Sequence, residues 1–393
     1  MATQPTDIHA DGSLRSVEAA AAPAACADGI ARASLSSCLA PDMIARWAAL
    51  EKTSSEPNPF YSPWGLAPAL KAFDPGGRVE ILQFWAAGEL RGLLPLQRSG
   101  SYYGYPIPHL RGWMHDNAFC GTPLVAAEHE REFWSALLDH LDAHPSHSLF
   151  FHLEGLAEDG ALFRALADIV TARGAACAIV HREERAMLKS PNSAEEYFAA
   201  SMSGKKRKEL RRQYNRLSEM GELRFKRSRN AHDLPRWAGE FLTLEAAGWK
   251  GAAGSALASD PRTAALFTDV LDGAAGAGKL ERLALYLDDK PIAMLVNFLC
   301  PPGAFSFKTA FDERYSRFSP GVLLQRENLD ILHEPSIDWT DSCAAADHPM
   351  IERIWREKRS MVRLSVGIGG KLRQAAFRQL LKAESGSEIM GSK

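Results

Sequence analysis

The sequence lacks the cysteine patterns of a metal or disulfide protein. Its six cysteines are scattered, form no Cys-x-x-Cys pair, and have no histidines at zinc-ligand spacing. We therefore assign no metal site, and free thiols fit a reducing compartment. The expected location is the cytoplasm, with peripheral contact to the inner membrane as an alternative.

The sequence also has no long apolar run and no large excess of positive or negative charge. The longest apolar run, Pro291–Pro302, is far shorter than the roughly 20 residues that span a bilayer. The formal net charge of -2 gives no reason to expect nucleic acid as a partner. Residues 1–34 lack the basic start and leucine-rich stretch of a secretion signal, and their Ala, Ser, Asp and Pro content predicts a disordered leader.

Helical and strand-like patterns alternate along the rest of the chain. Apolar spacing predicts helices over residues 41–51, 128–143, 159–173, 205–220, 233–248, 261–275, 320–332 and 349–358, with strand-like runs between most of them. This alternation predicts a layered mixed α/β (α+β) architecture. A length of 393 residues favours two domains.

Two segments share one plan of strand, polar turn and strand. They are Val79–Leu96 and Leu283–Leu299, the second with its turn at Asp288-Asp289-Lys290. The similarity predicts a tandem duplication, with domains at 35–188 and 189–393. The alternative is that two unrelated hairpins look alike.

The second hairpin is followed by a strand, Phe305–Phe311, and by the start of a helix at Ser319-Pro320-Gly321. Serine favours the N-cap, proline the first helical position, and glycine leaves room for a ligand near the backbone. Free N–H groups at such a helix start can hold a pyrophosphate. The first hairpin has no comparable segment after it.

These features resemble the GNAT acyltransferase superfamily, and in particular its two-domain branch related to FemAB-like and cellulose-biosynthesis-associated acetyltransferases. Further stretches that fit this branch are Lys205–Arg212, Phe241–Gly251, Phe307–Tyr315 and Asp341–Pro349. The resemblance covers about residues 185–366, with weaker similarity back to about residue 40. One departure is that Arg317-Phe-Ser-Pro-Gly-Val keeps only the arginine and a displaced glycine of the usual Arg/Gln-x-x-Gly-x-Gly/Ala signature.

The resemblance implies tandem GNAT-like domains, each a twisted mixed sheet flanked by helices. It also implies acyl-CoA, as acetyl-CoA or a long-chain acyl-CoA, as co-substrate of the second domain. The residues expected to hold it are Arg317, Ser319, Gly321, Val322 and Leu323. Those expected to bind the acceptor are His115, Asn117, Trp249 and Lys308.

Three residues are candidates for catalysis. Glu245 on a partly apolar helix could act as a general base, or could be a solvated position or an ion-pair partner of Lys250. Asp341 and His348 follow a strand end, where His348 suits proton transfer. The alternative there is that Asp347 caps a helix and His348 bonds locally.

Other positions leave their roles open. Lys308 lies in an apolar strand, so it should meet Asp312, Glu313 or a phosphate. Cys343 would be a nucleophile only with a base in reach, and because GNAT-type transfer normally needs no acyl-enzyme, this role is not expected. Because no tyrosine follows Tyr315, the group that protonates the leaving thiolate is unassigned.

A basic run, Lys205–Arg216, places Leu210, Tyr214 and Leu217 on one stripe and leaves its cations exposed. It is either a solvated face or a contact for CoA phosphates, an acidic acyl carrier protein or an anionic membrane. Nucleic acid is the least favoured partner.

The function that these features favour is transfer of an acyl group from acyl-CoA to an amine. The acceptor is expected to be a small-molecule or lipid amine, either on a sugar of an envelope polysaccharide or on a lipid base, as in a ceramide-synthase-like reaction. The rivals are a GNAT-fold scaffold without activity, which the degenerate signature favours, and FemAB-like aminoacyl transfer from tRNA.

Overall fold

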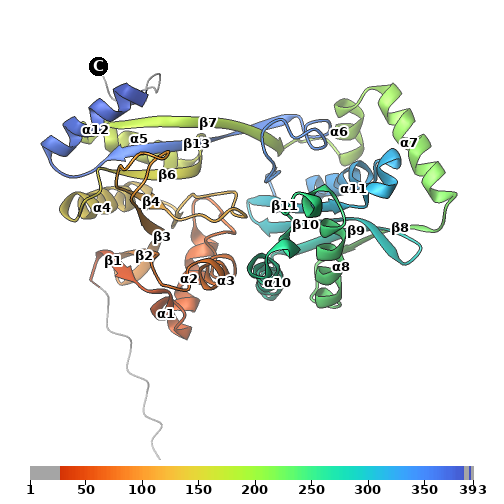
Figure 1. The fold of residues 1–393 in the computed structure, drawn as a ribbon, viewed down its shortest axis with the longest axis horizontal. Helices are drawn as coiled ribbons and strands as arrows, with labels where there is room; N and C mark the ends of the chain where they lie inside the picture. Colours follow the sequence, from red (N-terminus) through yellow and green to blue (C-terminus); the bar gives the residue numbers. More distant parts are fainter. Residues whose placement is uncertain (1–26, 385–388, 391–393) are drawn as a thin grey trace, which may run out of the picture.

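The computed structural model describes residues 27–384 and 389–390 (Figure 1). The strands of its N-terminal half are β1 (Gly29–Ala33), β2 (Glu80–Ala86), β3 (Glu89–Ser99), β4 (His109–Gly112), β5 (Leu124–Val125), β6 (Phe150–Ala157) and β7 (Cys177–Leu188). Those that follow are β8 (Leu223–Ser228), β9 (Leu280–Leu287), β10 (Lys290–Cys300), β11 (Gly303–Phe311), β12 (Trp339–Asp341), β13 (Glu357–Gly367) and β14 (Ile389–Met390).

Helices flank the sheet in both halves (Figure 1). The first half contains α1 (Leu35–Cys38), α2 (Pro41–Thr53), α3 (Pro63–Phe73), α4 (Glu130–Ala143) and α5 (Ala161–Arg173). The second contains α6 (Ala194–Ser201), α7 (Gly204–Ser218), α8 (Leu234–Ala246), α9 (Trp249–Ala252), α10 (Pro261–Gly276), α11 (Pro320–Asn328) and α12 (Lys371–Glu384). Short 3-10 turns occur at Leu257–Ser259, Glu313–Phe318 and Leu329–His333.

The sequence predicted most of these helices, because their apolar residues form one buried stripe. All the expected helices are confirmed to within a few residues except the last. The helix expected over 349–358 is wrong, since turns there lead directly into β13. Ile351, Ile354 and Trp355 are buried together in one apolar cluster, so a compact loop imitates helical spacing.

The predicted leader needs a correction at its C-terminal end. Residues 1–26 lie outside the described residues, but β1 pairs with β2 from Gly29 to Ala33. The segment called a leader is therefore ordered where it joins the sheet.

One pairing pattern occurs twice in a continuous sheet, which confirms the mixed α/β fold class. The strand order is β1-β2-β3-β4-β6-β13-β7-β12-β11-β10-β9-β8, with β5 beside β3 and β14 beside β7. In each half, three antiparallel pairings lead to one parallel pairing, β4 with β6 and β11 with β12. The two predicted hairpins are β2–β3 and β9–β10, at equivalent positions in this pattern.

The two halves share strands at their junction. β13, from the C-terminal segment, lies between β6 and β7 and pairs antiparallel with both. The end of β7 in turn pairs with β12. The domain boundary predicted at residue 188 falls at the end of β7, and β13 crosses back over it to join the sheet of the first half.

The parallel pair of the first half is closed by its own loop. After β4 the chain returns along β6, where the Gly121 N–H donates to the Gly155 carbonyl. A Cβ at position 121 would lie 2.1 Å from the Glu154 carbonyl oxygen and 2.6 Å from Met114 Sδ. This tight packing holds the loop after β4 against β6. Within the described residues, no helix is long and apolar enough to cross a membrane.

Candidate functional site

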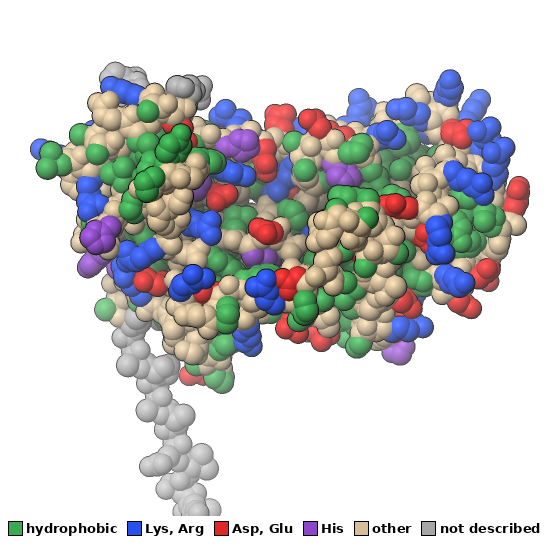
Figure 2. Space-filling model, viewed as in Figure 1, with side chains coloured by type: hydrophobic (Ala, Val, Ile, Leu, Met, Phe, Trp, Pro, Cys, Tyr) green, Lys and Arg blue, Asp and Glu red, His purple; other side chains and the backbone are tan. Residues whose placement is uncertain are grey.

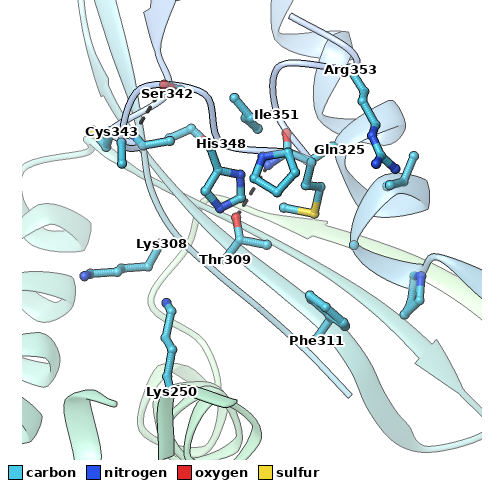
Figure 3. A pocket seen from close by; sticks show the side chains of 18 of the residues that line it. Lys250, Lys308, Thr309, Phe311, Gln325, Ser342, Cys343, His348, Ile351 and Arg353 are labelled. Atoms are coloured by element: carbon cyan, nitrogen blue, oxygen red, sulfur yellow. Dashed lines mark hydrogen bonds between the residues drawn. The ribbon is translucent and has the colours of Figure 1, made fainter. Parts of the chain in front are cut away.

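The main cavity lies where β11 and β12 part. They pair in parallel from Gly303 with Trp339 to Phe305 with Asp341, after which β12 ends while β11 continues. The gap opens into a cavity of about 760 Å³. Its walls come from β11, the residues after β12, the starts of α9 and α11, the loop at residues 348–353, and Phe119 of the first half (Figure 3).

A β-bulge shapes β11 at this cavity. Val296 pairs with Lys308 and Asn297 with Ser306, so Phe307 is an extra residue on β11. Bulges redirect side chains and are common beside active sites. Ser306 lines the cavity and is 4% exposed, yet its Oγ has no hydrogen-bond partner among the described residues. An unpaired buried hydroxyl is costly, so it is available for a ligand.

Lys308 and Lys250 both line the cavity (Figure 3). Lys308 Nζ donates to Asn117 Oδ1 at 2.7 Å and lies 5.2 Å from the Phe119 ring centre and 5.5 Å from that of Phe307. Burial, reinforced by the charge of Lys250, lowers the pKa of Lys308 to about 8. A substantial fraction of this amine is therefore neutral just above neutral pH, as a general base requires.

The start of α11 forms another wall. Ser319 has a left-handed backbone (φ 55°) and its side chain makes no capping bond, so it is an N-cap by position only. By helix geometry the N–H groups of Gly321 and Val322 have no partner within the helix. A Cβ on Gly321 would lie 2.8 Å from Met350 Sδ, so this glycine makes room for Met350.

A buried polar chain fixes α11 against the sheet. Asn297 donates to Glu281 and to Asn328, which donates to Gln325. Gln325 reaches Thr309 of β11 at 3.4 Å (Figure 3). Both Gln325 and Thr309 line the cavity, so this chain holds polar groups in place on the side facing α11.

The predicted catalytic residues do not all reach the cavity. Only His348 lines it; its Nδ1 is buried without a partner among the described residues, and burial lowers its pKa below the ordinary value. Glu245 is buried and accepts from Lys250 Nζ at 2.7 Å and from the Leu257 N–H at 2.8 Å. It therefore orients Lys250, which lines the cavity.

Asp341 lies beneath the cavity and is fully buried. Its Oδ2 meets Arg185 at 3.1 Å and Arg359 at 3.0 Å, and its Oδ1 accepts from the Cys343 N–H. Cys343 lines the cavity with a positive φ of 51°, and burial raises the pKa of its thiol well above the usual range. Asp341 thus holds a strained turn in the cavity wall.

Some of the other predicted site residues line the cavity, and others do not. Ser319, Gly321, Val322, Trp249 and Lys308 line the cavity. Leu323 is buried on the inner side of α11, and the Arg317 side chain lies over the Phe318 ring; neither residue lines the cavity. Lys308 meets neither Asp312 nor Glu313: Asp312 pairs with Arg314, and Glu313 accepts from the Trp249 N–H.

His115 and Asn117 do not line the main cavity. Both line a small apolar recess, and His115 also lines a polar cleft of about 290 Å³. Burial, reinforced by Lys308, lowers the pKa of His115 to about 4. The cleft is lined by Arg111, Asp116, Glu154, Glu183, Arg185 and Arg363, among others. Phe119 lines both the cleft and the main cavity, so its side chain is part of the wall they share.

Sequence reasoning missed several lining residues, notably Ser306, Thr309, Gln325, Phe119 and Arg353. Polar residues inside the apolar run Phe305–Phe311 were the available signal for the first two. The bulge leaves no mark in the sequence pattern. No three His, Cys, Asp or Glu side chains of residues 27–384 gather as a metal site.

Residues 204–382 match the family model described as acetyltransferase (GNAT) domain. This part of the chain is a GNAT domain. It contains β11, α11, β12 and therefore most of the cavity wall. The family resemblance inferred from the sequence is confirmed. A search of curated proteins finds no match to this chain.

Solved structures share the fold of almost the whole chain. A crystal structure of FemX aligns with a TM-score of 0.54 at 11% identity, covering 86% of this chain and 98% of FemX. A conserved protein of unknown function from Bacteroides thetaiotaomicron aligns at 0.50 and 11%, covering 85% and 98%. The C-terminal domain of a putative lysylphosphatidylglycerol synthetase from Agrobacterium fabrum gives 0.48 and 13%, covering 89% and 98%. At these identities the likeness to FemX and the Bacteroides protein concerns the fold alone.

Proposed function

We propose that this protein is an acyl-CoA-dependent N-acyltransferase. The observation that carries the proposal is Lys308, a buried lysine with a pKa of about 8 in the lining of an open cavity in a GNAT domain. An inactive scaffold has no need of such a group, because burying it costs free energy. The open cavity beside Ser319–Val322 also speaks against a scaffold, whose channel would be filled.

The donor fits the side of the cavity that faces α11. The free N–H groups at the start of α11 suit a pyrophosphate, and Arg353 at the same wall is exposed and has no ion-pair partner among residues 27–384. The unpaired Ser306 hydroxyl is a candidate donor to the thioester carbonyl oxygen. Acetyl-CoA and long-chain acyl-CoA share these contacts.

Amide formation requires one proton to move. The neutral acceptor amine attacks the thioester carbon, forming the C–N bond, and Lys308 takes the proton that the nitrogen loses. The C–S bond then breaks, and the protonated Lys308 gives that proton to the departing thiolate. Lys308 thus acts as the base and also as the acid that protonates the thiolate, the role that the sequence left unassigned.

The acceptor approaches from the side of Phe119. The adjoining cleft contains the carboxylates of Asp116, Glu154 and Glu183 and the guanidinium of Arg185, whose Nε is buried and unpaired among the described residues. Such a cleft suits a polar amine that carries hydroxyl or phosphate groups. An aminosugar of an envelope polysaccharide and a lipid base both meet this description.

The proposal is tested with the parent protein, Lys308→Arg and Lys308→Met. Arginine keeps the charge but cannot lose its proton, so it separates a base from a fixed cation. We expect both variants to bind acyl-CoA in calorimetry and to lose acyl transfer to amines by about 100-fold or more. Absence of parent binding to any acyl-CoA or acyl carrier would overturn the proposal. Turnover with aminoacyl-tRNA but with no acyl-CoA would mean that aminoacyl-tRNA, not acyl-CoA, is the donor.

A further inference from the structure

One face of α7 is covered by cations. Lys205, Lys206, Arg207, Lys208, Arg211, Arg212 and Arg216 are all exposed, and Figure 2 shows blue side chains gathered at the edge of the molecule where α7 lies. The apolar side of the helix packs inward through Leu210 and Leu217. Lys205, Lys208, Arg212 and Arg216, spaced by three or four residues, therefore form an outward stripe about 16 Å long.

Most of these cations lack acidic partners among the described residues, unlike those of the neighbouring strand. On β8, Arg224 pairs with Asp289, and Arg227 with Glu281. On α7, Arg212 pairs with the carboxylate of Glu209, and the other cations have no acidic partner among the described residues. The β8 charges thus belong to the fold, whereas the stripe is left for an external anion.

The stripe is tied to the wall of the main cavity. Gln213 of α7 donates to the Arg317 carbonyl at 3.1 Å. Ser316 and Ser319, on either side of Arg317, line the cavity. An anion bound along α7 is therefore held beside the side of the cavity that faces α11, where the donor is expected.

We propose that the α7 stripe docks an acidic acyl carrier protein, which presents the acyl group as a thioester on its phosphopantetheine arm. The inference rests on the proposed acyl transfer and names the donor partner. A stripe one helix wide complements an acidic helix lying along it. A flat anionic membrane fits less well, because the exposed acids Glu195, Glu196, Glu219 and Glu222 lie close to α7 in the chain and would repel anionic lipid.

The test compares two variants of equal charge. The stripe variant carries Lys205→Gln, Lys208→Gln and Arg216→Gln, three exposed cations without acidic partners. The control carries Lys52→Gln, Lys71→Gln and Lys371→Gln, exposed lysines of α2, α3 and α12. Binding of purified holo acyl carrier protein is measured at low and high salt, and kcat/KM is measured with one acyl group on the carrier and on CoA.

We expect the stripe variant to lose about tenfold or more in carrier affinity at low salt and in kcat/KM with acyl carrier, with kcat/KM for acyl-CoA unchanged. The control should match the parent. An equal loss of kcat/KM with both donors would overturn the proposal, because it would mean that the stripe binds the phosphates of CoA. If the stripe variant still binds the carrier but no longer sediments with phosphatidylglycerol vesicles, the proposal is overturned and the stripe is a membrane-binding surface.

The binding measurement separates the two proposals. Carrier binding through the stripe without turnover of any donor would leave docking supported and acyl transfer refuted. Turnover of acyl-CoA with no carrier binding by the parent would refute docking alone.

Discussion

Lys308 Nζ donates to Asn117 Oδ1 at 2.7 Å, although 191 residues separate them in the chain. The lysine comes from β11 of the GNAT domain and the asparagine from the loop after β4. The group proposed to transfer protons is thus positioned by both halves of the molecule. This contact gives the first half a role in the site, although the cavity itself lies beside the parallel strand pair of the second half.

The pH dependence of transfer should follow Lys308. Because a base must be neutral, kcat/KM is expected to rise with pH and to level off above about 8, the pKa of this amine. Asn117→Ala removes a hydrogen-bond acceptor from the charged form, so it should shift the rise to lower pH. A pH profile of the variant that is unchanged from the parent's would contradict this role for Asn117.

Lys308 should also limit stability. Its folded pKa is below the unfolded value of about 10.4, so its burial cost is fully present below pH 8 and disappears as pH rises towards 10. Lys308→Met is expected to raise the free energy of unfolding by roughly 1 to 3 kcal/mol at pH 7, and by less at pH 10. Urea titrations at both pH values provide the measurement. A gain that does not shrink at high pH would mean that packing, not charge, is responsible.

Ser306→Ala should separate stability from activity. Its hydroxyl is buried without a partner in the described structure, so removing it should leave stability unchanged or raise it by about 1 kcal/mol. Loss of a donor to the thioester oxygen should lower kcat by at least about tenfold. Thr309→Val, whose hydroxyl meets Gln325, is the matched control on the same strand. Full activity of Ser306→Ala would exclude the hydroxyl from the reaction.

Asp341 should matter chiefly for stability. Asp341→Asn leaves Arg185 and Arg359 buried without their carboxylate, which typically costs about 3–5 kcal/mol. Asp338→Asn, on an exposed position before β12, should change stability by less than about 0.5 kcal/mol. Thermal unfolding of both variants tests this. A stable Asp341→Asn protein that is inactive would instead return Asp341 to catalysis.

Gly321 is expected to affect donor binding through Met350. Gly321→Val should push Met350 Sδ, which would lie 2.8 Å from a new Cβ, and obstruct the start of α11. We expect weaker CoA binding in a folded protein, measured by calorimetry. Met350→Ala removes the clash. If the double variant binds CoA normally, displacement of the loop at Met350 caused the weaker binding; if its binding stays weak, the valine itself blocks the N–H groups. Parent-like affinity of folded Gly321→Val would exclude this helix start as the pyrophosphate site.

The sequence alone determined the elements with regular apolar spacing. The helices from Pro41 and Pro261, both β-hairpins and the GNAT resemblance of the C-terminal part follow from local patterns, because each element buries one face whatever it packs against. The same logic predicted a false helix at 349–358, where Ile351, Ile354 and Trp355 are buried by a loop.

Only the tertiary structure decided which residues meet. The bulge at Phe307, the approach of Asn117 and Phe119 to Lys308, and the return of β13 to the first half depend on contacts between residues far apart in the chain. Glu245, Asp341 and His348 illustrate the difference: each has a residue type suited to catalysis, yet only His348 lines the cavity. Local patterns fix which face of an element is buried, whereas distant packing fixes which polar group on it remains free to react.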